Sequence, residues 1–133
     1  MTEAWLACVD NVVRFTWSFD DGDVDAVVDL FAADGVWHRS DGDVVGHEGL
    51  RRLMASRGDM LARHVLSNHR VSLTGTDSAL VESYVTAYRA TGPLRPARLE
   101  QPLLVGRYRD VLARAEGSWK IQRRSLHVDF QAA

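Results

Sequence analysis

The side chains best suited to acid–base chemistry in this sequence are a histidine, His64, and a run of carboxylates that begins with Asp20. An imidazole titrates near neutral pH, and a neighbouring carboxylate holds its tautomer. Such a pair could remove a proton alpha to a carbonyl and return it to a departing hydroxyl, a syn elimination. Two alternatives stay open. Asp20 could end or cap a helix, together with Asp21, Asp23 and Asp25, and His64 could be a core histidine bonded to the backbone.

Other polar side chains on the predicted strands could hold the oxygen atoms of a substrate. Strand alternation places Asn68 on the same face as His64, although Asn68 could equally lie in a strand bulge. Arg123 and Arg124 point to opposite faces of the last predicted strand, so at most one of them faces inward. An inward arginine would need a carboxylate, either Asp20 or one on a ligand, because an unpaired buried charge is costly.

Tyrosines on two predicted strands are a second source of hydrogen bonds. Alternation groups them with their neighbours: Tyr84, Thr86 and Tyr88 share one face, and Gly106, Tyr108 and Asp110 share a face of the following strand. One tyrosine of this set could supply a phenol to a pocket. Each of them could equally pack as an aromatic side chain of the sheet.

Motifs for metals and cofactors are absent from the sequence. On a regular strand His69 faces away from His64, so these two histidines cannot share a metal ion. Cys8 is the only cysteine, which excludes an internal disulfide and a cysteine-rich zinc site. There is no glycine-rich phosphate loop, nucleophile elbow or nucleotide fingerprint. We therefore expect a reaction that needs no cofactor, or no reaction. The remaining histidines have no ligand-like spacing: His38, His47 and His127.

The composition is that of an ordinary globular domain. The 133 residues are 46% hydrophobic and 26% charged, and a formal net charge of -2 argues against binding to nucleic acid or to an anionic membrane. Apolar stretches fall short of the roughly 20 residues that a membrane-spanning helix needs. The acidic start, with Glu3, differs from a signal peptide. We expect one domain over residues 1–133 and a soluble cytoplasmic protein.

The first third of the chain reads as helical. Apolar residues from Trp5 to Trp17 recur at three- and four-residue steps, and Gly22 favours an end to this helix after Asp20 and Asp21. Asp23 can cap a second helix over 24–31, with Val27, Val28 and Phe31 facing inward, before a stop at 33–35. A short strand over 36–38, a turn over 40–43 and a third helix over 48–55 follow.

The rest of the chain reads as antiparallel strands. The β-branched and aromatic runs predict strands over 63–73, 80–90, 103–114 and 119–130, with turns at 74–77 and 115–117 and a proline-containing loop over 91–100. Helices followed by antiparallel strands are typical of an α+β fold with the helices on one side of the sheet. We expect a cone-shaped α+β barrel, in which three N-terminal helices pack on a strongly curved, mostly antiparallel sheet.

Several segments, in order, resemble the SnoaL-like branch of the nuclear transport factor 2-like superfamily, from about residue 12 to 130. They are Phe19-Asp20-Asp21-Gly22-Asp23-Val24-Asp25 leading to Leu30-Phe31, Ala33-Asp34-Gly35-Val36-Trp37, Arg63-His64-Val65-Leu66-Ser67-Asn68, Gly106-Arg107-Tyr108-Arg109-Asp110 and Trp119-Lys120-Ile121-Gln122-Arg123-Arg124. The resemblance implies the cone-shaped fold. It says less about function, because this fold hosts many activities.

The resemblance also implies a site. The chain is similar to scytalone dehydratase and bile-acid dehydratase proteins, which pair an aspartate at the end of the first helix with a histidine on the first long strand. Asp20 and His64 match these positions, whereas Phe15 and Phe19 stand where tyrosines would polarise a carbonyl, and His38 lies about where another is expected. The residues expected to contact substrate are Phe15, Phe19, Trp37, His38, Asn68, Tyr88, Tyr108 and Arg124.

Three functions follow as hypotheses. The first is a cofactor-free lyase or cyclase that acts on a hydrophobic carbonyl compound, such as a polyketide or steroid-like molecule, with Asp20 and His64 moving protons. The second is a double-bond isomerase in which Asp20 is the mobile base. The third is a binding or dimerisation module without activity, which the missing tyrosines favour. The resemblance further implies a homodimer formed by the sheets back to back.

Overall fold

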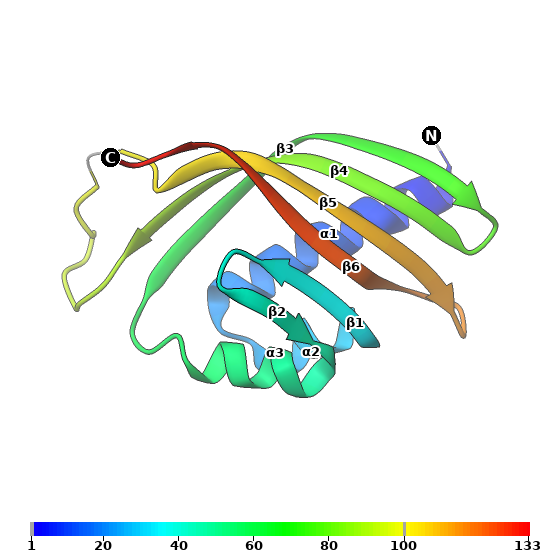
Figure 1. Cartoon of the computed structure of the whole chain (residues 1–133), viewed down its shortest axis with the longest axis horizontal. Helices are drawn as coiled ribbons and strands as arrows, with labels where there is room; N and C mark the ends of the chain where they lie inside the picture. Colours follow the sequence, from blue (N-terminus) through cyan, green and yellow to red (C-terminus); the bar gives the residue numbers. More distant parts are fainter. Residues whose placement is uncertain (1, 100) are drawn as a thin grey trace.

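The computed structural model describes residues 2–99 and 101–133, which form a strongly curved sheet with the helices packed on its concave side (Figure 1). This confirms the predicted α+β fold. The elements in chain order are α1 (Glu3–Asp21), α2 (Val24–Asp29), β1 (Phe31–Arg39), β2 (Gly42–Val45), α3 (Gly46–Ala55), β3 (Leu61–Gly75), β4 (Ser78–Ala90), β5 (Leu104–Ala115) and β6 (Ser118–Gln131). No helix in the described ranges is long and apolar enough to cross a membrane.

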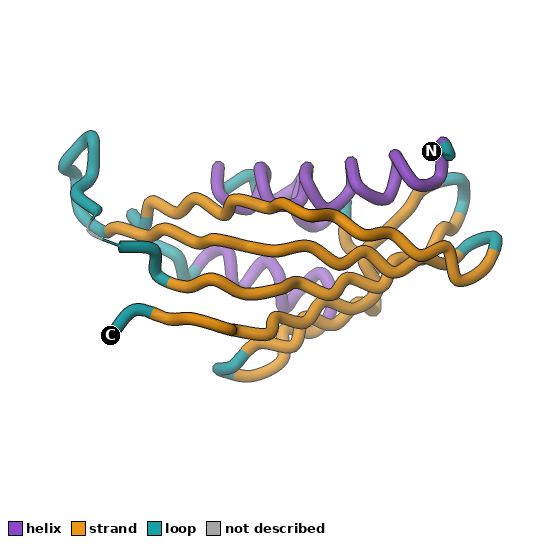
Figure 2. Tube along the Cα trace, turned by 90° about the horizontal axis from the view of Figure 1, so that it is seen from above, coloured by secondary structure: helices purple, strands orange, loops and turns teal. Residues whose placement is uncertain are grey.

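The sheet has six strands in the order β2-β1-β6-β5-β4-β3. The β1 and β6 strands are parallel, and every other neighbouring pair is antiparallel. Seen from above, the long strands curve together and α1 follows them on one side (Figure 2). The strand β3 forms one edge of the sheet. Its first residues and the turn after α3 lie next to the end of α1, where His64 and Arg57 bond to Asp20 and Phe19.

Helix α1 is fixed at both ends by its sequence. Thr2 caps the first turn by accepting a hydrogen bond from the backbone N–H of Trp5, and Gly22 ends the helix with a φ of 74°, which is accessible to glycine without strain. The buried side of the helix is Cys8, Val12, Phe15 and Phe19. Trp17, which the periodicity placed on the apolar stripe, is 68% exposed instead.

The region after α1 differs from the prediction. Asp23 caps α2 by accepting from the N–H of Ala26, as expected, but the helix ends at Asp29. Phe31 therefore begins the strand β1, and the predicted stop at 33–35 lies inside this strand, where its register against β6 shifts. The short strand β2 was not predicted, because the turn residues at 40–43 hide its start.

A bulge in β3 changes which side chains face the helices. Ser67 pairs with Tyr84 and the next registered pair is Arg70 with Glu82, so both Asn68 and His69 lie opposite a single residue of β4, Ser83. Asn68 has a positive φ of 55° and is exposed. The extra residue turns His69 inward, which corrects the expectation that His69 faces away from His64.

Candidate active site

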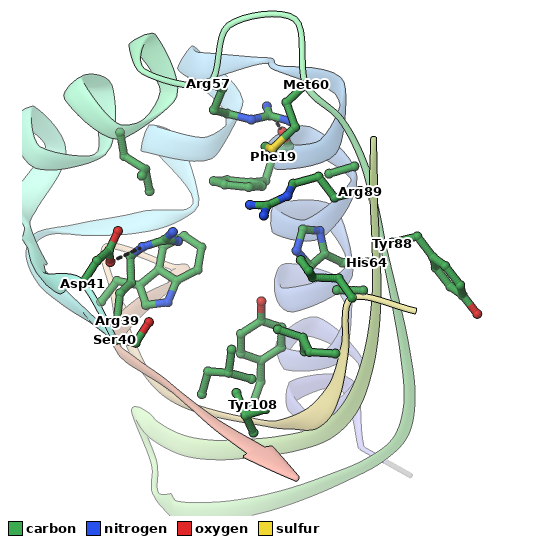
Figure 3. Close-up of a pocket in the computed structure, with 18 of the residues that line it drawn as sticks. Phe19, Arg39, Ser40, Asp41, Arg57, Met60, His64, Tyr88, Arg89 and Tyr108 are labelled. Carbon is green, nitrogen blue, oxygen red and sulfur yellow. Dashed lines mark hydrogen bonds and ion pairs between the residues drawn. The ribbon is translucent and has the colours of Figure 1, made fainter. Parts of the chain in front are cut away.

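A cavity of about 440 Å³ lies between the concave face of the sheet and the end of α1 (Figure 3). Its volume is within the range of small-molecule sites. Phe19, Trp37, His64 and Tyr108, all predicted to contact a substrate or to react, contribute to its wall. Apolar side chains from α3, β3, β5 and β6 complete it: Leu53, Ala62, Leu104, Leu126 and Val128.

Asp20 and His64 form a hydrogen-bonded pair at the side of this cavity. The Nδ1–H of His64 donates to Oδ1 of Asp20 over 2.6 Å, and the backbone N–H of His64 donates to Oδ2 over 2.8 Å. The two side chains are 8% and 21% exposed, respectively. Asp20 does not cap a helix, because that position belongs to Gly22 for α1 and to Asp23 for α2.

This geometry sets the roles that the two groups can have. Both oxygens of Asp20 are occupied by His64, and Asp20 is not among the residues that line the cavity. The imidazole ring does line it, so Nε2 is the nitrogen left to accept a proton from a bound molecule. The aspartate holds the ring by two bonds, in the manner of an orienting group beside a general base.

Tyr108 is the tyrosine that reaches the cavity. Its side chain extends from β5 with the hydroxyl pointing into the open space (Figure 3). Within the described part of the chain this hydroxyl has no hydrogen-bond partner, which leaves it free for a ligand. Burial raises the pKa of Tyr108, and the positive charge of Arg124 opposes this shift. The phenol therefore keeps its proton at neutral pH and can donate a hydrogen bond.

Arg124 faces inward, as predicted, but its carboxylate partner is Asp110 and not Asp20. Nε donates to Oδ1 of Asp110 over 2.8 Å, and the two side chains are 2% and 0% exposed. The guanidinium lies 3.8 Å from the ring centre of Tyr108 and also contacts Phe15 and Trp37. Because Arg124 is absent from the cavity wall, it supports the ring of Tyr108 from behind and does not contact a ligand.

Besides Arg124, four predicted contact residues do not direct their side chains into the cavity. Phe15 is fully buried in the aromatic core, one turn of α1 before Phe19. His38 is on the outer face of β1, bonded to Asp43. Tyr88 points away from the cavity in Figure 3, because Ala87 and Arg89 are the inward residues of that strand.

Asn68 is the fourth misplaced residue, and its displacement follows from the bulge in β3. It lies on the outer surface with Tyr84, Arg107 and His127, where a second hollow is found. On the inner side, Nε2 of His69 and the hydroxyl of Ser83 are instead buried without a hydrogen-bond partner in the described residues.

The cavity also contains three arginines that were not among the predicted site residues. Arg39 ends β1, Arg57 follows α3 and Arg89 is on β4, and all three side chains reach into the space (Figure 3). Arg57 also donates hydrogen bonds to the carbonyl oxygens of Phe19 and Asp20, which ties it to the end of α1. The alternation of β4 contained the signal for Arg89, since Arg89 is opposite in phase to Tyr88.

Other chemistry has little support in the described residues. They contain no group of three or more His, Cys, Asp or Glu side chains placed to hold a metal ion. Cys8 is buried in α1, and burial raises the pKa of its thiol to about 11. A buried, protonated thiol is a poor nucleophile. The groups available for catalysis at the cavity are thus an oriented imidazole, a phenol and guanidinium groups.

The fold and site can now be compared with known proteins. A solved structure provisionally assigned as an aromatic ring hydroxylase from Novosphingobium aromaticivorans has a TM-score of 0.83 and 26% identity, covering 97% of this chain and 91% of that one. A provisionally assigned scytalone dehydratase from the same species has a TM-score of 0.81 and 20% identity, over 95% and 84% of the chains. The hexachlorocyclohexane dehydrochlorinase LinA type 2 has a TM-score of 0.80 and 15% identity, over 96% and 86%.

These likenesses agree on the fold, while the proteins they concern differ in activity. A search among curated proteins finds no match. The comparison that decides the family is with a model of the SnoaL-like domain, which matches residues 1–125. The match covers every element from α1 to β5 and the first part of β6. The chain belongs to the SnoaL-like domain family.

Proposed function

We propose that the protein is a cofactor-independent lyase that eliminates water from a hydrophobic carbonyl compound, such as a polyketide or steroid-like molecule, with closely related cyclisation chemistry as the nearest variant. The observation that carries the proposal is the Asp20–His64 pair, with the imidazole on the wall of a cavity into which Tyr108 also projects. Each group has a separate part in the reaction.

The first step is removal of a proton alpha to the carbonyl. Nε2 of His64 accepts this proton, and the hydrogen bond from Nδ1–H to Asp20 stabilises the resulting imidazolium. The hydroxyl of Tyr108 donates to the carbonyl oxygen, on which negative charge develops as the enolate forms. Tyr108 thereby supplies the phenol that the family resemblance places at positions 15 and 19, where this chain has Phe15 and Phe19.

The second step is loss of the hydroxyl group on the beta carbon. The imidazolium of His64 returns its proton to this oxygen as the C–O bond breaks, and the enolate electrons form the new C=C bond. Water leaves, the carbonyl is restored and His64 is neutral again. One base can serve both steps when the proton and the hydroxyl depart from the same face, as in a syn elimination.

The isomerase hypothesis, with Asp20 as the mobile base, has less support. Asp20 would need a free oxygen at the cavity, but both of its oxygens accept hydrogen bonds from His64 and its side chain is 8% exposed. A binding module without activity is the alternative that the experiment must separate from the lyase.

The test is elimination from a hydroxytetralone, a bicyclic β-hydroxy ketone that aromatises to a fluorescent naphthol when it loses water. We expect turnover by the wild type and a loss of about 10²–10⁴-fold in kcat for His64→Gln, the usual contribution of a positioned base. His127→Gln, an exposed histidine on the outer face, is the matched control and should react normally. Equal rates for His64→Gln and wild type, or binding of the ketone without turnover, would support the binding module instead.

We also propose that the protein forms a homodimer through the outer face of its sheet. This face exposes large apolar side chains, among them Val65, Tyr84 and Phe130, which are 52%, 52% and 71% exposed. Exposed apolar surface of this kind is typical of protein interfaces. The same side chains point away from the cavity, so the dimer would leave the site open.

A further inference from the structure

The cavity is electrically unbalanced. Arginines from three separate elements reach into it, Arg39 from the end of β1, Arg57 from the segment after α3 and Arg89 from β4 (Figure 3). Among the described residues that line the cavity, Asp41 is the only carboxylate, and its side chain is 72% exposed. An apolar ketone would make no use of this excess of positive charge.

The protein itself neutralises little of that charge. Arg39 pairs with Asp41 over 3.3 Å. Arg57 donates to two backbone carbonyls, which have no net charge, and its Nε atom is buried without a partner in the described part of the chain. Within residues 2–99 and 101–133, Arg89 makes neither an ion pair nor a side-chain hydrogen bond. Among the residues that the structure describes, two guanidinium groups therefore have no counter-charge at one side of the cavity.

The arginines are also held in place for a ligand. The guanidinium of Arg57 lies 4.7 Å from the ring centre of Phe19, and that of Arg39 lies 4.9 Å from the ring centre of Trp37. Stacking on a ring restricts a guanidinium without using its N–H groups. Arg57 uses one N–H of each terminal nitrogen for the carbonyls of Phe19 and Asp20, and the second N–H of each is left to bind a carboxylate. In a partly enclosed cavity such a pairing is stronger than at an open surface.

The positions of these groups give a ligand an orientation. In Figure 3, Arg57 and Arg89 lie beside Phe19 at one end of the cavity, whereas the hydroxyl of Tyr108 points up from the other, with the His64 ring between them. The ring centres of Phe19 and His64 are 5.9 Å apart. A rigid molecule with an acid group at one end could thus bind the arginines and present its carbonyl to Tyr108.

We propose that the ligand of this cavity is an organic carboxylate: a ring system with one acidic group, which Arg57 and Arg89 bind. The carboxylate would be the substrate class of the proposed lyase. The claim that it reacts rests on the proposed function, whereas the claim that it binds does not. A carboxylate has two oxygens, so one oxygen can accept from each of the two guanidinium groups. Arg39, already paired with Asp41, contributes mainly to the positive potential.

The experiment compares two probes of the same shape, naphthoate and its neutral amide naphthamide, by calorimetric titration of the full chain. We expect naphthoate to bind at least tenfold more tightly, and this preference to shrink as salt is added. Arg89→Gln should remove most of the preference, because it removes one charge-assisted contact. Arg109→Gln, an arginine on the exposed side of β5, is the matched control and should keep it.

Each outcome bears on the carboxylate site independently of catalysis. Equal affinities for the two probes, no detectable binding of either, or an unchanged preference in Arg89→Gln would overturn the inference. Tighter binding of naphthyl phosphate than of naphthoate would also overturn it, in favour of a phosphate ligand. A preference for naphthoate that persists in His64→Gln supports the site even if the elimination assay fails, so the two proposals fail separately.

Discussion

Removing Arg124 while leaving Asp110 in place should be among the most destabilising single changes in this protein. The two side chains are 2% and 0% exposed and are joined by hydrogen bonds of 2.8 and 3.4 Å. Arg124→Met would leave a carboxylate in the core with neither water nor a cation. Breaking a buried pair in this way costs about 3–5 kcal/mol. That is a large part of the roughly 5–15 kcal/mol by which a domain is stable.

The double variant separates an unpaired charge from lost packing. In Asp110→Leu/Arg124→Met both charges are replaced by apolar groups of similar size, a change that is often neutral or stabilising. We expect urea unfolding to give a free energy near that of the wild type for the double variant and a much lower one for Arg124→Met. Arg70→Met, which breaks a pair in which the arginine is 76% exposed, should cost at most about 1 kcal/mol.

The dependence of Arg124→Met on pH adds a second readout. Burial raises the pKa of Asp110, and the variant lacks the guanidinium that opposes this shift. The folded variant then binds a proton at a higher pH than the unfolded chain, in which Asp110 titrates near its ordinary 3.8. Its deficit relative to wild type should be smallest in acid and grow as the pH rises. A loss of less than about 1 kcal/mol for Arg124→Met at pH 7, or a double variant no more stable than the single one, would show that the buried carboxylate does not need its guanidinium partner.

Four further predictions test other parts of the structure. Tyr108→Phe should lower kcat for a carbonyl substrate by about 10²–10³-fold, the effect of removing one donor to an oxyanion, while its urea midpoint stays near that of the wild type; an unchanged kcat would exclude the phenol from the reaction. Burial lowers the pKa of His69 below 6.5, so the unfolded chain binds that proton first and stability should fall as the pH drops below 6.5; His69→Gln should reduce this fall, and an identical pH profile in urea would contradict the burial of the ring. Gly106→Ala should reduce the free energy of unfolding by about 1–3 kcal/mol and so lower the melting temperature, because the new Cβ would lie 2.3 Å from the carbonyl oxygen of His127; an unchanged melting temperature would contradict this packing. Phe130→Asp should convert the proposed dimer to a monomer in sedimentation velocity, and a wild type that sediments as a monomer would exclude the dimer.

The fold could be predicted because its elements have strong local signals. The period of three to four residues along α1 and the glycine at position 22 define the first helix, and β-branched runs define β3 to β6. The segment over 31–45 was harder, because β1 carries Ala33, Asp34 and Gly35 in its interior. These residues favour turns, and only pairing with β6, which is distant in sequence, holds them in a strand.

Site residues were harder to predict than elements because alternation gives relative faces and not absolute ones. Tyr84, Thr86 and Tyr88 do share a face, but it is the outer one, and the small residue Ala87 lines the cavity with Arg89. Aromatic residues are more often buried than arginines, so the usual rule pointed to the wrong face. At Asn68 the phase itself failed, because one inserted residue in a strand exchanges its two faces.

The Asp20–His64 pair could be predicted because the family resemblance matched both positions and because both residues precede the bulge that upsets the alternation of β3. Asp20 lies in the last turn of α1, and His64 lies near the start of β3, before the bulge. The hydrogen bond between Oδ2 of Asp20 and the backbone N–H of His64 fixes the strand itself against the helix end, whichever way later residues point. Arg57 has the opposite character, since it belongs to no strand or helix and acquires its place only by binding the carbonyls at the end of α1. Both contacts join residues that are distant in sequence, 44 positions apart for His64 and Asp20 and 38 for Arg57 and Phe19. The difference is that an aspartate and a histidine indicate acid–base chemistry by their types, whereas an arginine in a turn indicates a ligand site only once the fold has placed it in a cavity.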